Sequence, residues 1–289
     1  MENAEKLKEL VREKYGAIAR EGGDCCGPTS CCGSSSPEGV FVDISDDYTA
    51  KEGYVEEADL GLGCGIPTDA ADLKPGQVVL DLGSGAGNDV FVARKIVGET
   101  GRVIGVDMTP DMVRKARENA ARQGFANVDF RLGEIESLPV EASSVDRIIS
   151  NCVLNLVPDK QAAFSEMLRV LKPGASFGVS DVVLEGAFPE ALKEAAELYV
   201  GCVSGAIPKT DYLEMLASTG FEGVRIVKEK VIDLPEDLLA AHLGEAQRTA
   251  LKDSGVRVLS ITVQGVKPAK DSAACCTPLA TAGACCAPA

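Results

Sequence analysis

A run of glycines between two aspartates is the part of this chain best suited to hold a nucleotide. Asp81 lies in an apolar stretch, and the sequence GSGAG follows at positions 83–87. Glycine lets the backbone turn tightly and approach a ligand closely. Asp107 stands 20 positions after Gly87, at the end of the next β-branched run, where a carboxylate can accept hydrogen bonds from ribose hydroxyls. The segment therefore predicts a site for a nucleoside-containing ligand.

The spacing of these glycines separates two classes of ligand. A dinucleotide site has the pattern G-x-G-x-x-G, whereas this loop reads D-x-G-x-G-x-G. The carboxylate of Asp81 would repel a pyrophosphate at the turn, but it would favour a ligand with an ammonium, a sulfonium and no phosphate. S-adenosylmethionine has those charges, so we predict it as the cofactor. The alternative is a strand-to-helix turn that binds nothing.

Three cysteines outside the low-complexity segments could supply thiolates to a substrate: Cys64, Cys152 and Cys202. They precede the first expected strand, follow the fourth and follow the fifth, so we expect them at one edge of the sheet. A cysteine taken alone is more often a small buried hydrophobic residue. Three thiols beside a methyl donor, however, suit trivalent arsenic, which binds three thiolate sulfurs and keeps a lone pair that can attack a sulfonium methyl.

Eight further cysteines form four adjacent pairs near the ends of the chain: Cys25-Cys26, Cys31-Cys32, Cys275-Cys276 and Cys285-Cys286. Neighbouring cysteines rarely form a disulfide with each other without strain, but they can offer two thiolates to one soft ion. The surrounding sequence is rich in Gly, Ser, Ala and Pro, which is typical of linkers and disordered tails. Binding of a soft element and an expendable linker both stay open as interpretations.

Composition excludes several classes of function. The net charge of −15 argues against a nucleic-acid surface, because phosphate binding requires clustered Lys and Arg. No apolar run approaches the length of a membrane span, about 18 residues, and the N-terminus lacks the apolar core of a signal peptide. We therefore expect a cytoplasmic protein without nucleic-acid or membrane partners. His242 is the only histidine, which excludes catalysis by several imidazoles.

Strands and helices alternate along the middle of the chain. The expected strands there are 78–82, 103–106, 128–132, 145–151 and 175–181. The expected helices are 2–20, 46–60, 88–97, one starting at Pro110, 159–171, 189–200, 211–218 and most of 234–254. This alternation predicts an α/β fold with a mostly parallel sheet and helices on both faces. Two late strands at 224–232 and 258–266 are compatible with a terminal hairpin on the same sheet.

The stretch from residue 60 to 182 resembles the arsenite S-adenosylmethionine methyltransferases. The resemblance rests on GLGCGIP, VVLDLGSGAG, GRVIGVDMTPDMV, FRLGEIESLPV, VDRIISNCVLNLVPDK and RVLKPG, and it recurs at YVGCVSGAI. The glycine loop alone would indicate only the wider class I methyltransferases, whereas GEIESLP, SNCVLNL and GCVSGA are more specific. The resemblance implies a Rossmann-like fold of seven strands, the last one antiparallel, and methyl transfer from S-adenosylmethionine to thiol-bound arsenic.

The resemblance also implies roles for particular residues. The expected catalytic residues and arsenic(III) ligands are Cys64, Cys152 and Cys202, with Cys64 as third ligand or reductant. The resemblance implies that the cofactor is bound by Asp81, Gly83, Gly85, Asp107, Met108, Ile135 and Asn151. We expect Ser84 and Gly87 of the glycine turn, and Glu134 at the end of the third expected strand, to bind the cofactor as well. The expected substrate is arsenite or its glutathione conjugate. A thiol reductant, glutathione or thioredoxin, is expected to restore the cysteines, and we expect a monomer.

Four segments follow from this interpretation. An N-terminal helix and Cys-rich linker occupy 1–45, and the cofactor-binding Rossmann-like domain spans 46–182. An arsenic-binding cap and the last strands span 183–267, and a disordered tail with Cys pairs spans 268–289.

Two other functions are compatible with parts of this sequence. A methyltransferase of an ordinary oxygen, nitrogen or carbon nucleophile would not depend on the three cysteines. A thiol-rich metalloid buffer would bind arsenite without consuming S-adenosylmethionine. An oxidoreductase that uses NAD is disfavoured by Asp81 and by the glycine spacing.

Overall fold

The computed structural model describes residues 2–21, 46–186, 205–233, 236, 239–240 and 244–269. Cys202, His242, the expected helix at 189–200 and the four cysteine pairs lie outside these residues.

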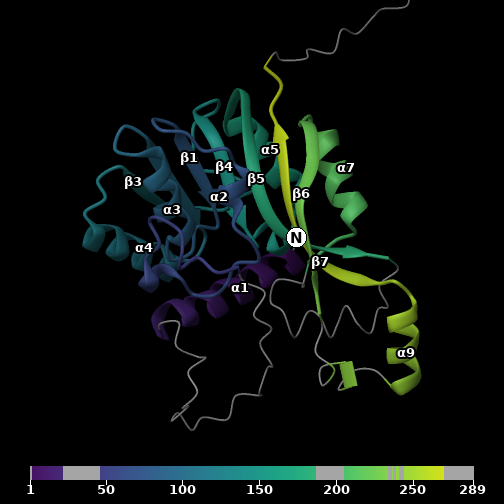
Figure 1. Cartoon of the computed structure of the whole chain (residues 1–289). Helices are drawn as coiled ribbons and strands as arrows, with labels where there is room; N and C mark the ends of the chain where they lie inside the picture. The colour runs from purple at the N-terminus through teal and green to yellow at the C-terminus, as the bar shows by residue number, and fades with distance from the viewer. Residues whose placement is uncertain are drawn as a thin grey trace, which may run out of the picture.

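A seven-stranded sheet forms the centre of the molecule, with the order β3-β2-β1-β4-β5-β7-β6 (Figure 1). Its strands are β1 (Val78–Leu82), β2 (Arg102–Asp107), β3 (Val128–Leu132), β4 (Val145–Asn151), β5 (Leu171–Glu185), β6 (Glu222–Ile232) and β7 (Arg257–Val266). The first five strands pair in parallel, and β7 runs antiparallel to both β5 and β6. The expected seven-stranded sheet with an antiparallel last strand is confirmed. Because the strand order reverses between β1 and β4, a ligand crevice is expected beyond their carboxyl ends.

Helices cover both faces of this sheet, because successive side chains of a strand point to opposite faces. Val79 packs with the face covered by α3 (Asn88–Val97) and α4 (Pro110–Gln123). Leu80 and Leu82 pack with the opposite face. That face is covered by α5 (Lys160–Val170) and α7 (Lys209–Thr219). Burial on both faces explains why β1 is almost continuously apolar.

The first helix lies across one end of this sheet. α1 (Glu2–Glu21) contacts α4 and is drawn in purple along the lower edge of Figure 1. Lys8 Nζ lies 2.6 Å from Glu134 and 3.0 Å from Glu136, and Arg12 lies 2.6 Å from Glu134. These ion pairs attach α1 to the segment that follows β3. None of the described helices is long and apolar enough to cross a membrane.

The expected helix at 46–60 was wrong, because only one 3-10 turn, η1 (Glu56–Ala58), forms there. Gly53 has a φ of +90° and lies so close to α3 that a Cβ would be 2.7 Å from Phe91 O. Tyr48 is buried against groups distant in sequence. Close tertiary contacts therefore override the helical spacing in this segment.

Smaller differences occur near the C-terminus. β5 extends to Glu185 because residues 182–185 pair with β7. Helix α9 covers Glu245–Asp253 of the expected 234–254, and the other described residues at 236 and 239–240 are helical as well. Two short elements, α2 (Pro67–Ala70) and η2 (Leu154–Leu156), were not expected.

Candidate functional site

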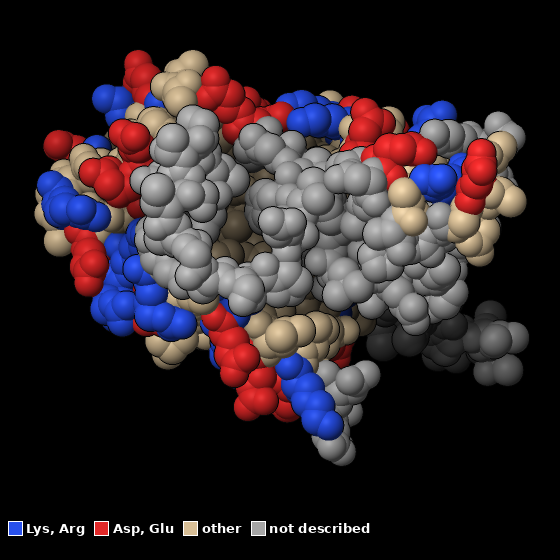
Figure 2. Space-filling model, turned by 90° about the horizontal axis from the view of Figure 1, so that it is seen from below, with Lys and Arg blue, Asp and Glu red and all other residues tan. Residues whose placement is uncertain are grey.

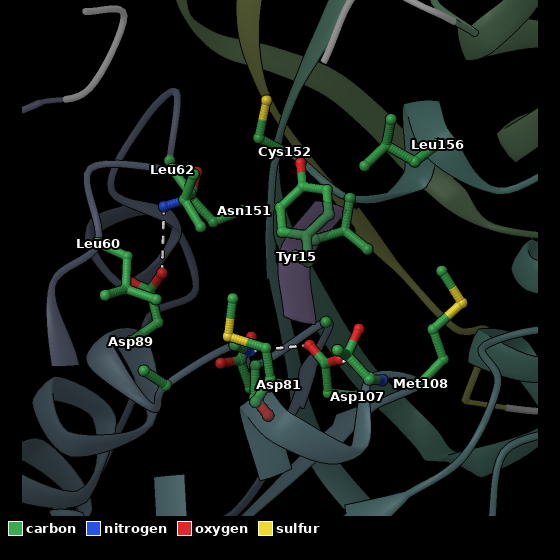
Figure 3. A pocket seen from close by; sticks show the side chains of 18 of the residues that line it. Tyr15, Leu60, Leu62, Asp81, Asp89, Asp107, Met108, Asn151, Cys152 and Leu156 are labelled. Carbon is green, nitrogen blue, oxygen red and sulfur yellow. Dashed lines mark hydrogen bonds between the residues drawn. The ribbon is translucent and has the colours of Figure 1, made fainter. Parts of the chain in front are cut away.

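A cavity opens beyond the carboxyl ends of β1, β2, β3 and β4, and Figure 3 shows it from close by. Its empty volume is about 1120 Å³, part of it open to solvent. Side chains of α1, among them Tyr15, close one wall. Seen from the side on which α1 lies (Figure 2), this face of the molecule is hollowed, with uncharged surface inside the hollow.

The glycine turn after β1 forms the floor of this cavity. Gly83 and Ser84 donate from their backbone N–H groups to Val106 O, at 2.8 and 3.0 Å. Gly85 has a φ of +50°, and a Cβ there would meet no atom within 4 Å. The turn therefore needs glycine at position 85 for its backbone conformation and presents bare backbone to the cavity.

Asp107 joins this turn to the start of α4. Its Oδ2 accepts from Gly85 N at 3.0 Å, and its Oδ1 accepts from Thr109 N at 2.8 Å. Burial raises the pKa of Asp107 despite these two hydrogen bonds. Each oxygen keeps a lone pair, so the carboxylate can still accept from a ligand hydroxyl.

The cavity also holds a buried carboxylate that lacks a donor. Asp81 is 2% exposed, and within the described part of the chain no group donates a hydrogen bond to it. Burial, followed by the charges of Asp89 and Asp107, raises its pKa well above the usual value. Burial likewise raises the pKa of Asp89 to about 6. Three buried acids around one cavity disfavour an anionic ligand and favour a cationic one, so these residues fit S-adenosylmethionine.

Asn151, at the end of β4, connects this cavity to the loop that carries Cys64. Its Oδ1 accepts from Cys64 N at 3.0 Å, and its Nδ2 donates to Asp89 Oδ2 at 3.1 Å (Figure 3). Tyr48 OH donates to the other oxygen of Asp89 at 2.7 Å. Sequence reasoning missed Tyr48 and Asp89, because nothing in their local sequence reports contacts with residues so far along the chain.

Cys152 lies on the wall of the cavity in an uncommon backbone conformation. Its φ is +60°, it is 2% exposed, and its N–H donates to Ser180 O at 2.7 Å. A left-handed residue other than glycine costs about 1 kcal/mol or more and is frequent at functional sites. Figure 3 shows its side chain at the opposite end of the cavity from Asp81. The positions of Asp81 and Cys152 would let a long ligand contact both ends.

Cys64 is 1% exposed and is not one of the residues that line the cavity. Cys64 and Cys152 do not form a disulfide with each other. Both lie close enough to Tyr212 to raise the pKa of its hydroxyl, after the larger effects of burial and of Asp181. The described part of the structure thus brings two of the three expected thiols around one buried hydroxyl.

Asp181 and Tyr212 were also missed from the sequence. Asp181 is fully buried, and burial raises its pKa to about 7 although Val182 N and Tyr212 OH donate to it. An aspartate inside the apolar run SFGVSDVVL was a signal that could have been used.

Most of the expected cofactor-binding residues do line the cavity: Asp81, Gly83, Ser84, Gly85, Asp107, Met108, Ile135 and Asn151. Two do not. The Glu134 carboxylate accepts from Lys8 and Arg12 of α1, and Glu136 lines the cavity in its place. Gly87 lies against the rings of Phe91 and Phe130, where a Cβ would come within 3.0 Å of each. Its role is close packing under the turn.

A metal centre has no support among the described residues, since they contain no group of three His, Cys, Asp or Glu side chains arranged to hold an ion. Of the three expected arsenic ligands, Cys64 and Cys152 belong to the described residues and Cys202 does not.

Comparisons with known proteins agree with this geometry. Residues 73–220 match a family model described as a methyltransferase domain. The arsenite methyltransferase of Halobacterium salinarum is 43% identical over 279 residues, which are 92% of this chain and 68% of that protein. The arsenite methyltransferase of Aquipseudomonas alcaligenes is 36% identical over 83% of this chain and 69% of its own length.

A solved structure gives the same result. The arsenic(III) S-adenosylmethionine methyltransferase from Chlamydomonas reinhardtii superposes with a TM-score of 0.61 and 36% identity, covering 71% of this chain and 68% of that one. The fold and the cavity define a class I methyltransferase that depends on S-adenosylmethionine. Within that class, this chain belongs to the arsenite methyltransferase family.

Proposed function

We propose that this protein transfers methyl groups from S-adenosylmethionine to thiol-bound trivalent arsenic and releases mono- and dimethylated arsenicals. The proposed arsenic ligands are Cys64, Cys152 and Cys202. The observation that carries the proposal is the strained Cys152, which shares one cavity with the buried carboxylate of Asp81. Membership of the arsenite methyltransferase family supports the choice of substrate.

The residues around the glycine turn would hold the cofactor. When bound, S-adenosylmethionine supplies a methyl group on a positively charged sulfur. Asp81 would balance the positive charge, and Asp107 would accept from the ribose hydroxyls. Met108 and Ile135 supply apolar contact area in the same cavity. We retain Glu134 and Gly87 as residues that support this site through α1 and through the packing of the turn.

The cysteines would bind arsenic by ligand exchange. Each thiol replaces one hydroxide of arsenite, an As–S bond forms as an As–O bond breaks, and the thiol proton leaves with the hydroxide as water. Three exchanges release three waters and leave the arsenic lone pair unshared. A glutathione conjugate of arsenite would instead lose glutathione thiols, each carrying away a cysteine proton.

Methyl transfer then needs positioning more than acid–base chemistry. The arsenic lone pair forms the As–C bond as the carbon–sulfonium bond breaks, so arsenic is formally oxidised from the trivalent to the pentavalent state. Two thiolate ligands, which we assign to Cys64 and Cys152, then couple as a disulfide. In this coupling two As–S bonds break as one S–S bond forms, and the two electrons left on arsenic make it trivalent again. Two water molecules or external thiols then replace the departed disulfide and Cys202, the Cys202 thiolate takes up a proton, and the methylated arsenical is released. Most of the rate would come from holding the lone pair in line with the methyl group.

An external dithiol or two monothiols must reduce that disulfide before the next cycle. We propose glutathione or thioredoxin for this step, and the cytoplasm as the compartment, because thiols are kept reduced there. We also propose that the chain works as a monomer. In this scheme 46–182 forms most of the cofactor site, α1 within 1–45 closes one wall of it, and 183–267 contributes to arsenic binding and the last strands.

The test is arsenite-dependent turnover of S-adenosylmethionine by the purified full chain with glutathione, with the arsenic products separated by chromatography. Methylated arsenic that disappears in Cys152→Ser is the expected result. Cofactor binding without an arsenic product would favour a methyltransferase of another substrate. Arsenite binding without turnover would favour a metalloid buffer, and full methylation by Cys152→Ser would overturn the proposed chemistry.

A further inference from the structure

The loop that carries Cys64 is pressed closely against the sheet. A Cβ on Gly63 would lie 2.6 Å from Asn151 Nδ2, and a Cβ on Gly65 would lie 2.5 Å from Ser180 Oγ. Separations below 3.0 Å are not tolerated by real Cβ atoms without movement. The glycines on both sides of Cys64 are therefore required because neighbouring side chains approach the backbone closely.

One side chain accounts for most of the polar contacts of this loop. Asn151 Oδ1 accepts from Cys64 N at 3.0 Å and from Gly65 N at 3.3 Å, and its Nδ2 donates to Gly65 O at 2.8 Å. The remaining carbonyl, Cys64 O, accepts from Ser260 Oγ at 2.6 Å. The backbone on both sides of the Cys64 thiol is thus anchored to two residues of the sheet.

The orientation of this amide is itself fixed. Asp89 can only accept when ionised, so the Asn151 nitrogen, 3.1 Å away, must face it. Tyr48 OH donates to Asp89 at 2.7 Å and accepts from Asn151 at 3.0 Å. A flipped amide would place its oxygen against the Asp89 carboxylate and its NH₂ against two backbone N–H groups. The network therefore aims Oδ1 at the Cys64 loop.

We propose that Asn151 is a positioning residue that holds the Cys64 thiol in register with the Cys152 thiol for a shared soft ligand. Asn151 directly precedes Cys152, so its side chain joins the strand end that carries one thiol to the loop that carries the other. Preorganised ligands lose less freedom on binding, which strengthens the complex. This inference rests on the proposed function, because it assumes that both cysteines bind arsenic.

A double-mutant cycle tests this role at equilibrium, with arsenite as the probe and no cofactor. Arsenite binding is followed by the ultraviolet absorption of arsenic–sulfur bonds in wild type, Asn151→Ala, Cys64→Ser and the double variant. We expect Asn151→Ala to weaken arsenite binding about tenfold and the same substitution to change it less than about twofold when Cys64 is already serine. Equal effects in both backgrounds would overturn the proposal.

Two further variants keep the test valid if Asn151→Ala folds poorly. In Gly63→Ala the added Cβ would collide with the Asn151 amide and displace the Cys64 loop from it. The resulting loss of arsenite affinity should depend on Cys64 in the same way. Asn127→Ala is the matched control, because that amide holds Gly98 O and Gly101 O at the opposite end of the sheet. It is expected to lower thermal stability without changing arsenite affinity. If Asn127→Ala lost as much arsenite affinity as Asn151→Ala, general destabilisation would explain both effects. That result would overturn the proposal.

Exchanging the side chains of Asn151 and Asp89 tests the same contact independently. Asn151→Asp places two carboxylates side by side, and adding Asp89→Asn restores one donor and one acceptor across that contact but not the donor to Gly65 O. Partial recovery of arsenite affinity over Asn151→Asp supports positioning, and a folded double variant that binds arsenite no better than Asn151→Asp contradicts it. The proposed function fails separately, if wild type forms no arsenic–sulfur absorption or makes no methylated arsenic.

Discussion

The hydroxyl of Tyr212 donates a 3.2 Å hydrogen bond to the Asp181 carboxylate, and both groups are fully buried beside the thiols of Cys64 and Cys152. Tyr212 comes from α7 and Asp181 from β5, so the pair joins the helical layer to the sheet at the proposed substrate site. Val182 N also donates to Asp181 at 3.0 Å. The pair keeps a carboxyl group buried where solvent cannot reach it.

Stability should fall as the pH rises towards neutrality on account of Asp181. Burial raises its pKa from 3.8 to about 7, so the folded state holds a proton that the unfolded state releases above about pH 4. The contribution is present below pH 3.8 and is lost as the pH rises to about 7. In Asp181→Asn, the fall in unfolding free energy between these pH values should be smaller by a few kcal/mol. Urea unfolding at pH 5 and pH 8 measures this, and an unchanged slope in the variant would contradict it.

Removing the Asp81 carboxylate should lower the affinity for S-adenosylmethionine and raise the thermal stability of the protein without cofactor. Asp81→Asn loses the charge that would balance the sulfonium and the ammonium, and we expect the dissociation constant of S-adenosylmethionine to rise about tenfold or more. The uncharged thioether of S-adenosylhomocysteine should be affected less. The apo melting temperature should rise, because a buried carboxylate without a donor is costly. Titration calorimetry and thermal melts check both effects.

Asp129→Asn is the control for that experiment. Asp129 pairs with Arg102 and Arg131 near the start of β3, away from the cavity. Its loss should leave cofactor affinity unchanged. A rise in affinity of Asp81→Asn for S-adenosylmethionine would contradict the assigned role.

The strain at Cys152 predicts different stabilities for two inactive variants. Cys152→Ala and Cys152→Gly both remove the thiol and should abolish arsenite methylation. Only glycine adopts a φ of +60° without cost, so Cys152→Gly should be more stable than Cys152→Ala by about 1 kcal/mol. Chemical denaturation of both variants measures the difference. Equal stabilities would show that the backbone at this position is not strained.

The ion pairs of α1 should contribute to cofactor affinity. Lys8 and Arg12 both contact Glu134, and Lys8 also lines the cavity. Glu134→Gln should raise the dissociation constant of the cofactor by about two- to fivefold, since partly exposed pairs are worth up to about 1 kcal/mol. Because salt screens such pairs, the difference from wild type should shrink in about 1 M salt. Glu141→Gln serves as the control, because Glu141 is exposed and no ion pair joins it to the described residues. Equal effects of the two substitutions would contradict the role of Glu134.

Much of the fold was accessible from local sequence patterns. The predicted bounds of β1, β3, β4 and α3 agree with the structure. Each depends on a short apolar period or on a glycine turn, and these are local properties. The same holds for Asp81, the glycines and Asp107, whose roles depend on residues adjacent along the chain. Their membership of one cavity followed from the rule for the carboxyl ends of parallel strands.

The tertiary structure alone decided the surroundings of the thiols. Tyr48 hydrogen-bonds Asp89 and Asn151, which are distant in sequence, and the segment expected to be a helix forms turns and one 3-10 turn instead. Sequence reasoning placed Cys64 near the site, but it did not predict that Cys64 is buried or that an asparagine amide holds its loop. The chain by itself determined which chemical groups are present and on which strand ends they lie. Packing of distant segments determined which carboxylates lose their solvent and which amide holds which loop, because desolvation and hydrogen bonding depend on neighbours in space.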